Sequence, residues 1–412
     1  MQNWLLPEFV EDMLPDEAWC IERMRAQFLD LLRKSGYQLV APPLLEYAES
    51  LLIDGSAEKL LAGHPDDMDL RTFKLVDQLS GRTLALRADI TPQVARIDAH
   101  LLNRQGVARL CYAGSVLHTQ PVGLTRTREL LQIGAELYGH GGLESDLEIQ
   151  QLMLQSLALL GIKDVHLDLG HVGVFRALVS HAKLDKNIES ELFVALQSKD
   201  SAALQSLAKP LDATLRNALL ALPTLYGNCA DVLAKARKLL PDYPGIGSAL
   251  DDLQSISRKL QPLVSSVGID LADLRGYHYH NGMVFAAYHA GSHDAIALGG
   301  RYDDLGKSFG RARAATGFSM DLRQLYRLLP PQATRLGVCA PHYEKLLSGG
   351  CPTKSLTGHP LDDAALRDKI AQLRAAGEAV VVDLLGDATL RRELQCDREL
   401  VLRDGVWQVV AL

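Results

Sequence analysis

Glu136 stands out because it is a carboxylate inside an otherwise apolar run, residues 130–138. Gln132 and Tyr138 share its face of the expected strand, since alternate side chains of a strand point to the same side. An amide and a carboxylate on one face can donate and accept hydrogen bonds to a small polar ligand. The alternative is a sheet that turns one polar face to solvent, and the periodicity of this stretch leaves both open.

The strand that carries Glu136 is expected to be half of a long antiparallel hairpin. Two apolar runs rich in strand-forming residues, 110–117 and 130–138, flank a polar loop. That loop contains Pro121, Gly123, Arg126 and Arg128. Two such runs with a proline and a glycine between them predict two paired strands.

Other elements are expected on either side of this hairpin. An amphipathic helix begins near Pro15 and ends near Ser35 and Gly36. Its apolar residues Ile21, Met24, Phe28, Leu31 and Leu32 recur at helical spacing. Residues 36–46 follow as a strand that runs into Pro42 and Pro43, or as an edge strand capped by these prolines.

A second hairpin and a helix start are predicted next. Residues 73–86 form the hairpin, with its turn at Ser80 and Gly81. Thr91 can cap a helix whose first residue is Pro92. Farther on, a helix is expected over 145–160 and a strand over 164–169, and residues 172–263 form helices with little strand signal.

Several motifs carry a family resemblance. Tyr112 and Gly114, Arg126 and Arg128, and the run from Gln132 to Glu136 stand where the second motif of class II aminoacyl-tRNA synthetases has them. Residues 36–46 resemble the first motif of that class and residues 317–325 the third, while 273–285 and 295–303 resemble two signatures of histidyl-tRNA synthetases. The resemblance implies an α+β fold over residues 1–330, an antiparallel sheet flanked by helices. It includes a helical insertion at about 172–263, in which we see no chemistry.

The resemblance to histidyl-tRNA synthetases also implies a pocket for free histidine. Carried over by motif, its residues are Asp89, Thr91, Gln132, Glu136, Arg275, Tyr279, His280 and Tyr302. Asp89 and Thr91 would hold the ammonium group, with Gln132 bridging. Arg275 would pair with the carboxylate as a charged fork. Glu136 would accept the imidazole N–H, with Tyr279 or His280 nearby and Tyr302 lining the floor.

Three positions depart from the synthetase pattern. His118 and Gln324 replace the arginines that grip the α- and γ-phosphates of ATP, and Gln120 replaces the glutamate that reads adenine. Fixed charges of this kind typically supply ~10²–10³-fold each, and a histidine and a glutamine cannot replace two permanently charged forks. We therefore expect no working synthetase and no catalytic residues.

Two further patterns suggest other ligands. His278 and His280 could share a strand face and bind a metal, but no third ligand stands at a recognisable spacing, which favours a pocket or packing role. Gly306 and Lys307 superficially match a phosphate-binding loop, yet the glycine that such a loop needs five places earlier is Arg301. The sequence thus predicts neither a metal nor a cofactor.

Composition points to a soluble globular protein. The 412 residues carry a formal net charge of −7 with 47% hydrophobic content, and the absence of a Lys/Arg cluster argues mildly against a nucleic-acid partner. The six cysteines are scattered, as in reduced cytosolic proteins. The N-terminus is acidic and proline-broken, and no apolar run reaches the ~18 residues that a membrane span needs. A cytoplasmic location is expected.

The C-terminal part, 334–412, is predicted to be a small α/β module. Strands are expected at 336–340 and 379–384, a helix at 362–376, and a last apolar pair at 399–402 and 407–410. The module stands where synthetases carry the domain that reads the anticodon, but it is short.

A synthetase body without these arginines and with a reduced tail resembles the regulatory subunits of ATP phosphoribosyltransferases. The resemblance implies a non-catalytic protein that activates a short-form catalytic subunit in the first step of histidine biosynthesis and mediates feedback by histidine. Its partners would be that subunit, a second copy in a homodimer core and free histidine, with no tRNA and no membrane. Two alternatives stay open: a divergent but active histidyl-tRNA synthetase, and a pseudo-synthetase scaffold in another pathway.

Overall fold

A nine-stranded sheet is the centre of the larger part of the chain in the computed structural model, which describes residues 5–52, 67–121, 127–275, 280–330, 336–341, 364–384 and 395–412. Within these residues the sheet order is β1 Gln38–Leu39, β5 Ala108–Leu117, β6 Glu129–Tyr138, β12 Ala315–Asp321, β11 Ala297–Arg301, β10 Met283–Tyr288, β7 His166–His171, β9 Ser266–Asp270 and β8 Tyr226–Asn228. Neighbours are antiparallel except β1 with β5 and β7 with β9. The expected α+β fold with a largely antiparallel sheet is confirmed.

The chain divides into two units, Met1–Leu329 and Pro330–Leu412, each with its own sheet. The helices of the first unit are α1 Pro15–Lys34, α2 Ala48–Leu51, α4 Asp67–Arg71, α5 Thr91–Arg96, α6 Leu143–Leu159, α7 Val172–Ala182, α8 Lys186–Gln197, α9 Ser201–Ala208, α10 Ala213–Ala221, α11 Cys229–Leu239, α12 Ile246–Leu260 and α13 Leu322–Leu328. None of the described helices combines the length and apolar character needed to cross a bilayer.

The long hairpin β5–β6 separates two apolar clusters. Ile133, Ala135 and Leu137 of β6 pack into the main core, whereas Leu130 and Tyr138 on the opposite face pack into a second cluster. Residues from Ile133 to Tyr138 are all buried, so the alternative of a face turned to solvent is wrong. Because both faces are covered, any polar group here must find a partner inside the protein.

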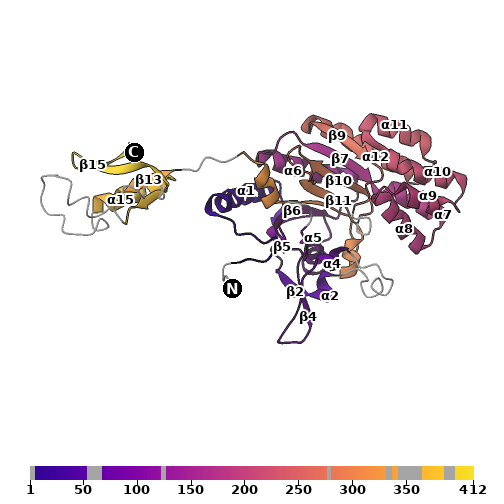
Figure 1. The fold of residues 1–412 in the computed structure, drawn as a ribbon, viewed down its shortest axis with the longest axis horizontal. Coiled ribbons are helices and arrows are strands. Elements are labelled where there is room, and N and C mark those ends of the chain that lie inside the picture. The colour runs from indigo at the N-terminus through magenta and orange to yellow at the C-terminus, as the bar shows by residue number, and fades with distance from the viewer. Residues whose placement is uncertain are drawn as a thin grey trace. The chain divides into compact units, whose positions relative to one another are not determined.

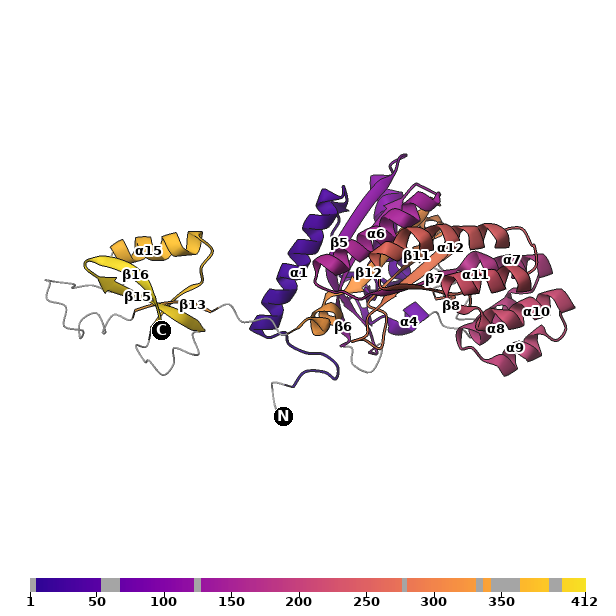
Figure 2. The ribbon, with the colours of Figure 1, turned by 90° about the horizontal axis from the view of Figure 1, so that it is seen from above.

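Helices α1 and α6 cover one face of the sheet. The apolar side of α1 packs Phe28 edge-on against Phe318 of β12, with ring centroids 6.4 Å apart. Figure 2 shows α1 running beside β5, which it contacts. The predicted start, end and buried residues of α1 are confirmed, since only Leu31 of the predicted set remains partly exposed.

A block of helices, α7 to α12, gathers beyond β7 and β9 at one end of the sheet (Figure 1). Four of these helices start with a short polar side chain that accepts a backbone N–H in the first turn, as expected of N-caps. The capping residues are Asp185, Asp200, Asp212 and Asn228. Strand β9, which pairs with β7 as the block returns to the sheet, was not predicted from the sequence.

The strand expected over 36–46 is instead two short strands in different sheets. Strand β1 pairs with β5 in the large sheet, while β2, Leu45–Tyr47, pairs with β4, Thr83–Leu86. Pro42 and Pro43 lie between them and have no N–H to donate to a ladder, which ends the first strand. Strand β4 also pairs with β3, Lys74–Val76, so the hairpin predicted at 73–86 is confirmed.

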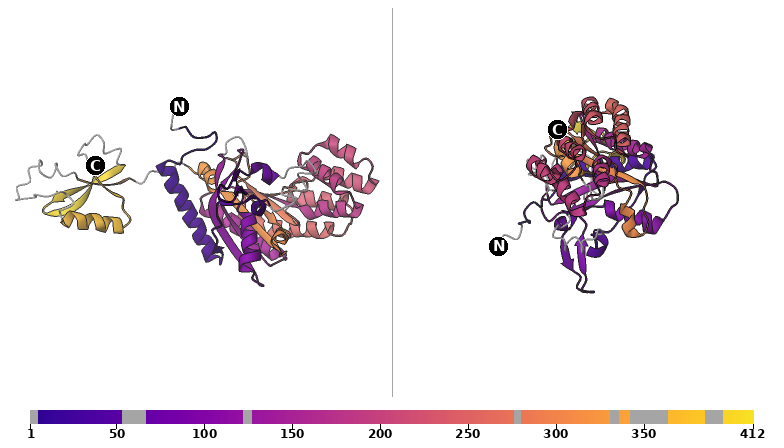
Figure 3. Two further views of the ribbon diagram at one scale, coloured as in Figure 1. Left: turned by 90° about the horizontal axis from the view of Figure 1, so that it is seen from below. Right: turned by 90° about the vertical axis from the view of Figure 1, so that its right-hand side faces the viewer.

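In its described residues, the second unit is a small mixed sheet with one helix on it. Its strand order is β14 Val380–Val382, β13 Gly337–Ala340, β15 Cys396–Arg403 and β16 Val406–Ala411. Helix α15, Ala364–Ala375, lies along this sheet (Figure 3) and buries Leu366 and Ile370 against it. The predicted strands and helix are therefore present, with β15 longer than the sequence indicated.

Candidate functional site

A cavity of about 410 Å³ opens on the face of the large sheet opposite α1. Its walls come from β6, β10, β11 and β12, from α4, from the segment around residues 89–92, and from Asp273, Arg275 and His280. Six of the eight predicted histidine-binding residues line it, namely Asp89, Thr91, Glu136, Arg275, His280 and Tyr302. Segments far apart in the sequence thus meet at one hollow.

Glu136 is the buried centre of this cavity, with a residue exposure of 1%. The Thr91 and Tyr112 hydroxyls each donate to its Oε1 at 3.1 Å, and the Tyr302 hydroxyl donates to its Oε2. Burial and, to a smaller extent, the charge of Asp89 raise the pKa of Glu136, these hydrogen bonds oppose the shift, and the net pKa is about 8. A proton therefore resides on this carboxyl group over much of the neutral range.

Glycine at position 317 makes room for the Glu136 carboxylate. Gly317 of β12 is the register partner of Glu136, and a Cβ built on it would overlap Glu136 Oε2. Gly300 of β11 similarly leaves space for the His280 ring. Because any other residue would push these side chains aside, the two glycines set the shape of the cavity.

Asp89, Thr91 and Gln132 form the wall beside Glu136. Gln132 Nε2 donates to Asp89 Oδ1 at 2.7 Å, and the Ile90 N–H donates to Gln132 Oε1 at 2.9 Å. Gln132 itself is not among the residues that line the cavity. It holds the segment that carries Asp89 and Thr91.

The prediction that Thr91 caps a helix starting at Pro92 is wrong. Helix α5 begins at Thr91, and Asp89 Oδ1 accepts the Thr91 N–H at 3.0 Å. The Thr91 hydroxyl turns instead to Glu136 and to the Tyr112 hydroxyl, 3.2 Å away. A buried acceptor in reach of this hydroxyl outweighs a local capping bond, which sequence periodicity cannot anticipate.

Arg275 lines the cavity but is already part of an ion pair. Its Nε donates to Asp273 Oδ1 at 2.8 Å, and its Nη2 donates to Asp273 Oδ2. His280 Nδ1 lies 3.1 Å from the Arg275 carbonyl oxygen, and burial lowers the pKa of this histidine, so its ring stays neutral. Four residues named in the sequence analysis, Gly123, Arg126, His278 and Tyr279, lie outside the described residues.

Several cavity residues escaped the sequence analysis. They are Met68 and Arg71 of α4, Gln197 at the end of α8, Asp273, and Ser319 of β12. Gln197 belongs to the helical block in which the sequence showed no chemistry. Ser319 could have been found, since it stands two residues after Gly317 and so shares its strand face. Nothing in the local pattern marks Arg71 or Gln197.

The three positions that depart from the synthetase pattern do not line the cavity. His118 is buried, with Nε2 2.9 Å from the Ala88 carbonyl oxygen, and Gln120 is exposed. Gln324 Nε2 donates to Ser292 Oγ and to the Ala295 carbonyl oxygen, both at 3.1 Å. The His118 and Gln324 side chains thus contact the protein's own backbone and loops.

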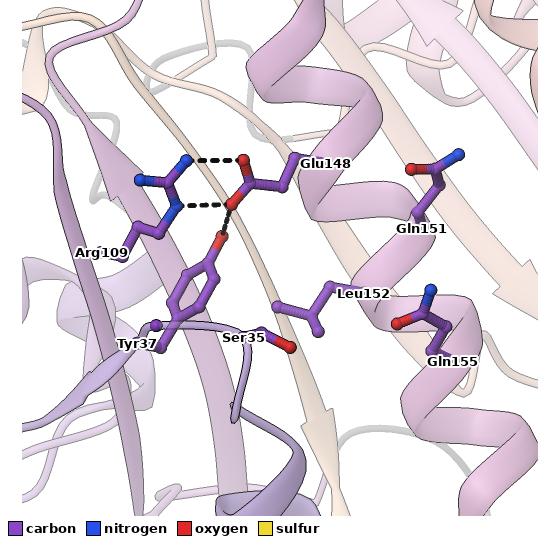
Figure 4. A pocket seen from close by; sticks show the side chains of 8 residues that line it. Ser35, Tyr37, Arg109, Glu148, Gln151, Leu152 and Gln155 are labelled. Carbon is purple, nitrogen blue, oxygen red and sulfur yellow. Dashed lines mark hydrogen bonds and ion pairs between the residues drawn. The ribbon is translucent and has the colours of Figure 1, made fainter. Parts of the chain in front are cut away.

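A second cavity of about 310 Å³ lies between the end of α1, β5 and α6 (Figure 4). Arg109 donates Nε and Nη2 to the two oxygens of Glu148 at 2.6 and 2.8 Å, and the Tyr37 hydroxyl donates to the same carboxylate at 3.0 Å. The charges of this cavity are thus neutralised among themselves, and the bonds join three elements of the fold. We regard it as structural.

Comparison with known proteins agrees with this geometry. The family profile described as histidyl-tRNA synthetase matches residues 9–325, and the profile described as the C-terminal domain of the ATP phosphoribosyltransferase subunit HisZ matches residues 360–410. Proteins named ATP phosphoribosyltransferase regulatory subunit from Nitrosospira multiformis and from Ralstonia nicotianae are each 55% identical. Each similarity covers 99% of this chain and 98% of the relative.

Solved structures are similar over nearly the whole chain. A protein from Bacillus halodurans, described as an ATP phosphoribosyltransferase regulatory subunit/histidyl-tRNA synthetase, has a TM-score of 0.78 at 26% identity, covering 95% of this chain and 96% of that one. Histidyl-tRNA synthetase from a Nostoc species has a TM-score of 0.75 at 18% identity over 100% of this chain and 97% of that one, which shows the fold alone. With these similarities in sequence and fold, the chain belongs to the ATP phosphoribosyltransferase regulatory subunits, a family built on the body of a histidyl-tRNA synthetase.

Proposed function

We propose that this chain activates a short catalytic ATP phosphoribosyltransferase subunit and carries feedback inhibition by histidine through the cavity around Glu136. Its relatives are named regulatory subunits of that enzyme, which supports a role beside a separate catalytic chain. The observation that carries the histidine part is the buried Glu136 carboxyl group, which receives three hydroxyl hydrogen bonds at the floor of an open cavity.

Histidine offers an ammonium, a carboxylate and an imidazole, and the cavity has a partner of suitable chemistry for each. Asp89 would take the ammonium beside Thr91. Glu136 would take the imidazole N–H, with the Tyr302 ring and the neutral His280 ring 6.2 Å apart around it. Of Arg71 and Arg275, which both line the cavity, Arg275 would pair with the carboxylate. Selection of histidine then follows because a ligand without an imidazole has no ring N–H to donate to the buried Glu136 carboxyl group.

The role is proposed to be non-catalytic. The side chains at His118 and Gln324 contact backbone carbonyls, and neither supplies a permanent positive charge for a triphosphate. Regulation requires that histidine bind two states of the assembly with different affinity, because a ligand with equal affinity for both shifts nothing.

Two measurements test the proposal. Calorimetry should detect histidine binding to this chain, and the absence of heat up to millimolar histidine would contradict a histidine cavity. Phosphoribosyl-ATP formation by the catalytic subunit should then be followed with the wild-type chain and with Glu136→Gln. We expect activation by both chains and weaker histidine inhibition with the variant. Identical inhibition curves would show that the sensor lies elsewhere.

The active oligomer is proposed to contain a homodimer of this chain, formed through the segment near Pro42 and Pro43 and the adjoining helix α1. Trp19 and Leu14 near the start of α1 are 72% and 69% exposed, which suits an interface of substantial apolar area. Sedimentation at micromolar concentration should give a dimer. A single monomeric species would contradict this part of the proposal.

A further inference from the structure

The Asp273 carboxylate occupies one edge of the Arg275 guanidinium group, which faces the cavity. Asp273 and Arg275 both line the cavity, and the Arg275 Nε lies 2.8 Å from Asp273 Oδ1 and 3.0 Å from Oδ2. The Arg275 backbone N–H also donates to Asp273 Oδ1, at 3.2 Å. Asp273 is largely shielded from water, with a side chain that is 14% exposed, whereas the Arg275 side chain is 37% exposed.

From this geometry we infer that Asp273 determines how strongly the cavity accepts a ligand carboxylate, by competing with it for Arg275. A guanidinium offers two edges to carboxylates, and Asp273 holds the edge formed by Nε and Nη2. A ligand carboxylate must either displace Asp273 or bind the remaining edge with a like charge close by. Both routes weaken binding, because like charges in a partly buried site repel.

Asp273 is not needed to keep Arg275 in the cavity wall. The Arg275 guanidinium carbon lies 5.8 Å from the centroid of the Tyr288 ring, a cation–π contact that restrains the side chain. The contact between His280 Nδ1 and the Arg275 carbonyl oxygen restrains the backbone. Removal of the Asp273 charge should therefore release an arginine that is still held near the ligand, rather than an arginine that swings away.

The charge of the whole cavity supports the same inference. Asp89, Asp273 and Glu136 are carboxyl groups in its wall, its cations are Arg71 and Arg275, and the Arg275 charge is balanced by Asp273. Such a wall favours the ammonium and imidazole ends of a ligand over its carboxylate end. The inference rests on the proposed histidine cavity and adds a residue that sets its affinity.

The test compares two ligands on three proteins by calorimetry. Histidine carries a carboxylate, and histamine has the same ammonium and imidazole groups without it. Asp273→Asn removes the charge and keeps an oxygen for the Arg275 N–H. Asp270→Asn is the matched control, since Asp270 also accepts a backbone N–H two residues on, from Ala272, and pairs with Lys199 at 2.9 Å, but does not line the cavity.

We expect Asp273→Asn to bind histidine about tenfold more tightly and histamine no more tightly than the wild type, as loss of one charge that repels the ligand carboxylate predicts. Asp270→Asn should change neither affinity. Weaker histidine binding by Asp273→Asn would overturn the inference and make Asp273 a positioning residue for Arg275. Equal changes for both ligands, or no change, would also overturn it.

Two further results separate the inference from the proposed function. If the wild-type chain binds neither ligand and Asp273→Asn binds neither, the histidine cavity itself is refuted and the inference falls with it. If the wild type binds histidine and the variant does not differ, only the inference fails. Should Asp273→Asn melt well below the wild type, Asp273→Ser keeps a short hydrogen-bonding side chain at this position and gives the same comparison.

Discussion

Two regions of the same sheet and its adjoining helix differ in what their side chains contact. One is the cavity around Glu136, and the other contains His118 and Gln324. At Glu136, three hydroxyls converge on a carboxyl group that faces an open hollow. At His118 and Gln324, the side chains contact carbonyl oxygens of the chain itself. Under the proposed function, one fold has kept one half of a two-substrate site and lost the other, because function resides in side chains rather than in backbone topology.

The contacts of Gln324 also suit a protein that binds no nucleotide at this position. The Gln324 amide N–H groups are satisfied by Ser292 and Ala295 without any ligand. An arginine at this partly buried position would need a negative partner, since an unpaired buried charge is costly. Without a triphosphate to supply that partner, a neutral amide is the more stable choice. The Glu136 carboxyl group, in contrast, is a buried ionisable group in the wall of a cavity, where a ligand can reach it.

The largest expected effect concerns catalysis. Because each missing phosphate-binding charge is worth ~10²–10³-fold, this chain should show no histidine-dependent exchange of pyrophosphate into ATP and no charging of tRNA. A synthetase assayed in parallel provides the positive control. If the unmodified chain catalyses either reaction at an ordinary enzymatic rate, the ATP site is functional and the contrast with the histidine cavity is wrong. His118→Arg combined with Gln324→Arg should recover some ATP affinity, measured by calorimetry.

The next largest effect concerns histidine binding in the cavity around Glu136. Glu136→Ala should lose ~2–4 kcal/mol of histidine binding, since the partner groups of a buried hydrogen-bonded acid are left unsatisfied. Glu148→Ala is the control, because Glu148 is also hydrogen-bonded to a tyrosine and an arginine but lies in the second cavity (Figure 4). Calorimetry should show normal histidine binding for this control. Equal losses in both variants would mean that stability, and not the ligand, is being measured.

Gly317→Ala should change the same cavity by steric overlap, without altering any charge. The added methyl group would collide with the Glu136 carboxylate, and overpacking of this kind typically costs ~1–3 kcal/mol of stability. Histidine binding should weaken together with the melting temperature. Gly247→Ala in helix α12 is the control, since nothing lies within 4 Å of its added carbon. If Gly317→Ala binds histidine normally, the position of Glu136 is not critical.

The sequence could predict the frame of the site better than its details. Motif register placed Glu136, Asp89 and Tyr302 at one cavity because alternation along strands and motif spacing are local properties. It gave Thr91 a capping role, although a buried acceptor from another strand engages that hydroxyl. It also gave no sign of the Asp273–Arg275 pair, because two residues of opposite charge so near in sequence are usually solvated on a surface. The roles of Thr91 and Asp273 depend on contacts that form only in the folded chain, which local sequence patterns do not contain.

The last prediction concerns the dependence of stability on pH, and it again compares Glu136 with Gln324. Burial raises the pKa of Glu136 to about 8 from an ordinary value of 4.5. Between these values the folded chain holds a proton that the unfolded chain has released, so stability must fall as pH rises through this window. The contribution is complete below about 4.5 and lost above about 8. Thermal melting of ligand-free protein from pH 5.5 to 8.5 should therefore show a decline that Glu136→Gln makes shallower. Gln324→Ala should leave the decline unchanged, because an amide does not titrate, and identical slopes for wild type and Glu136→Gln would mean that Glu136 is ionised throughout.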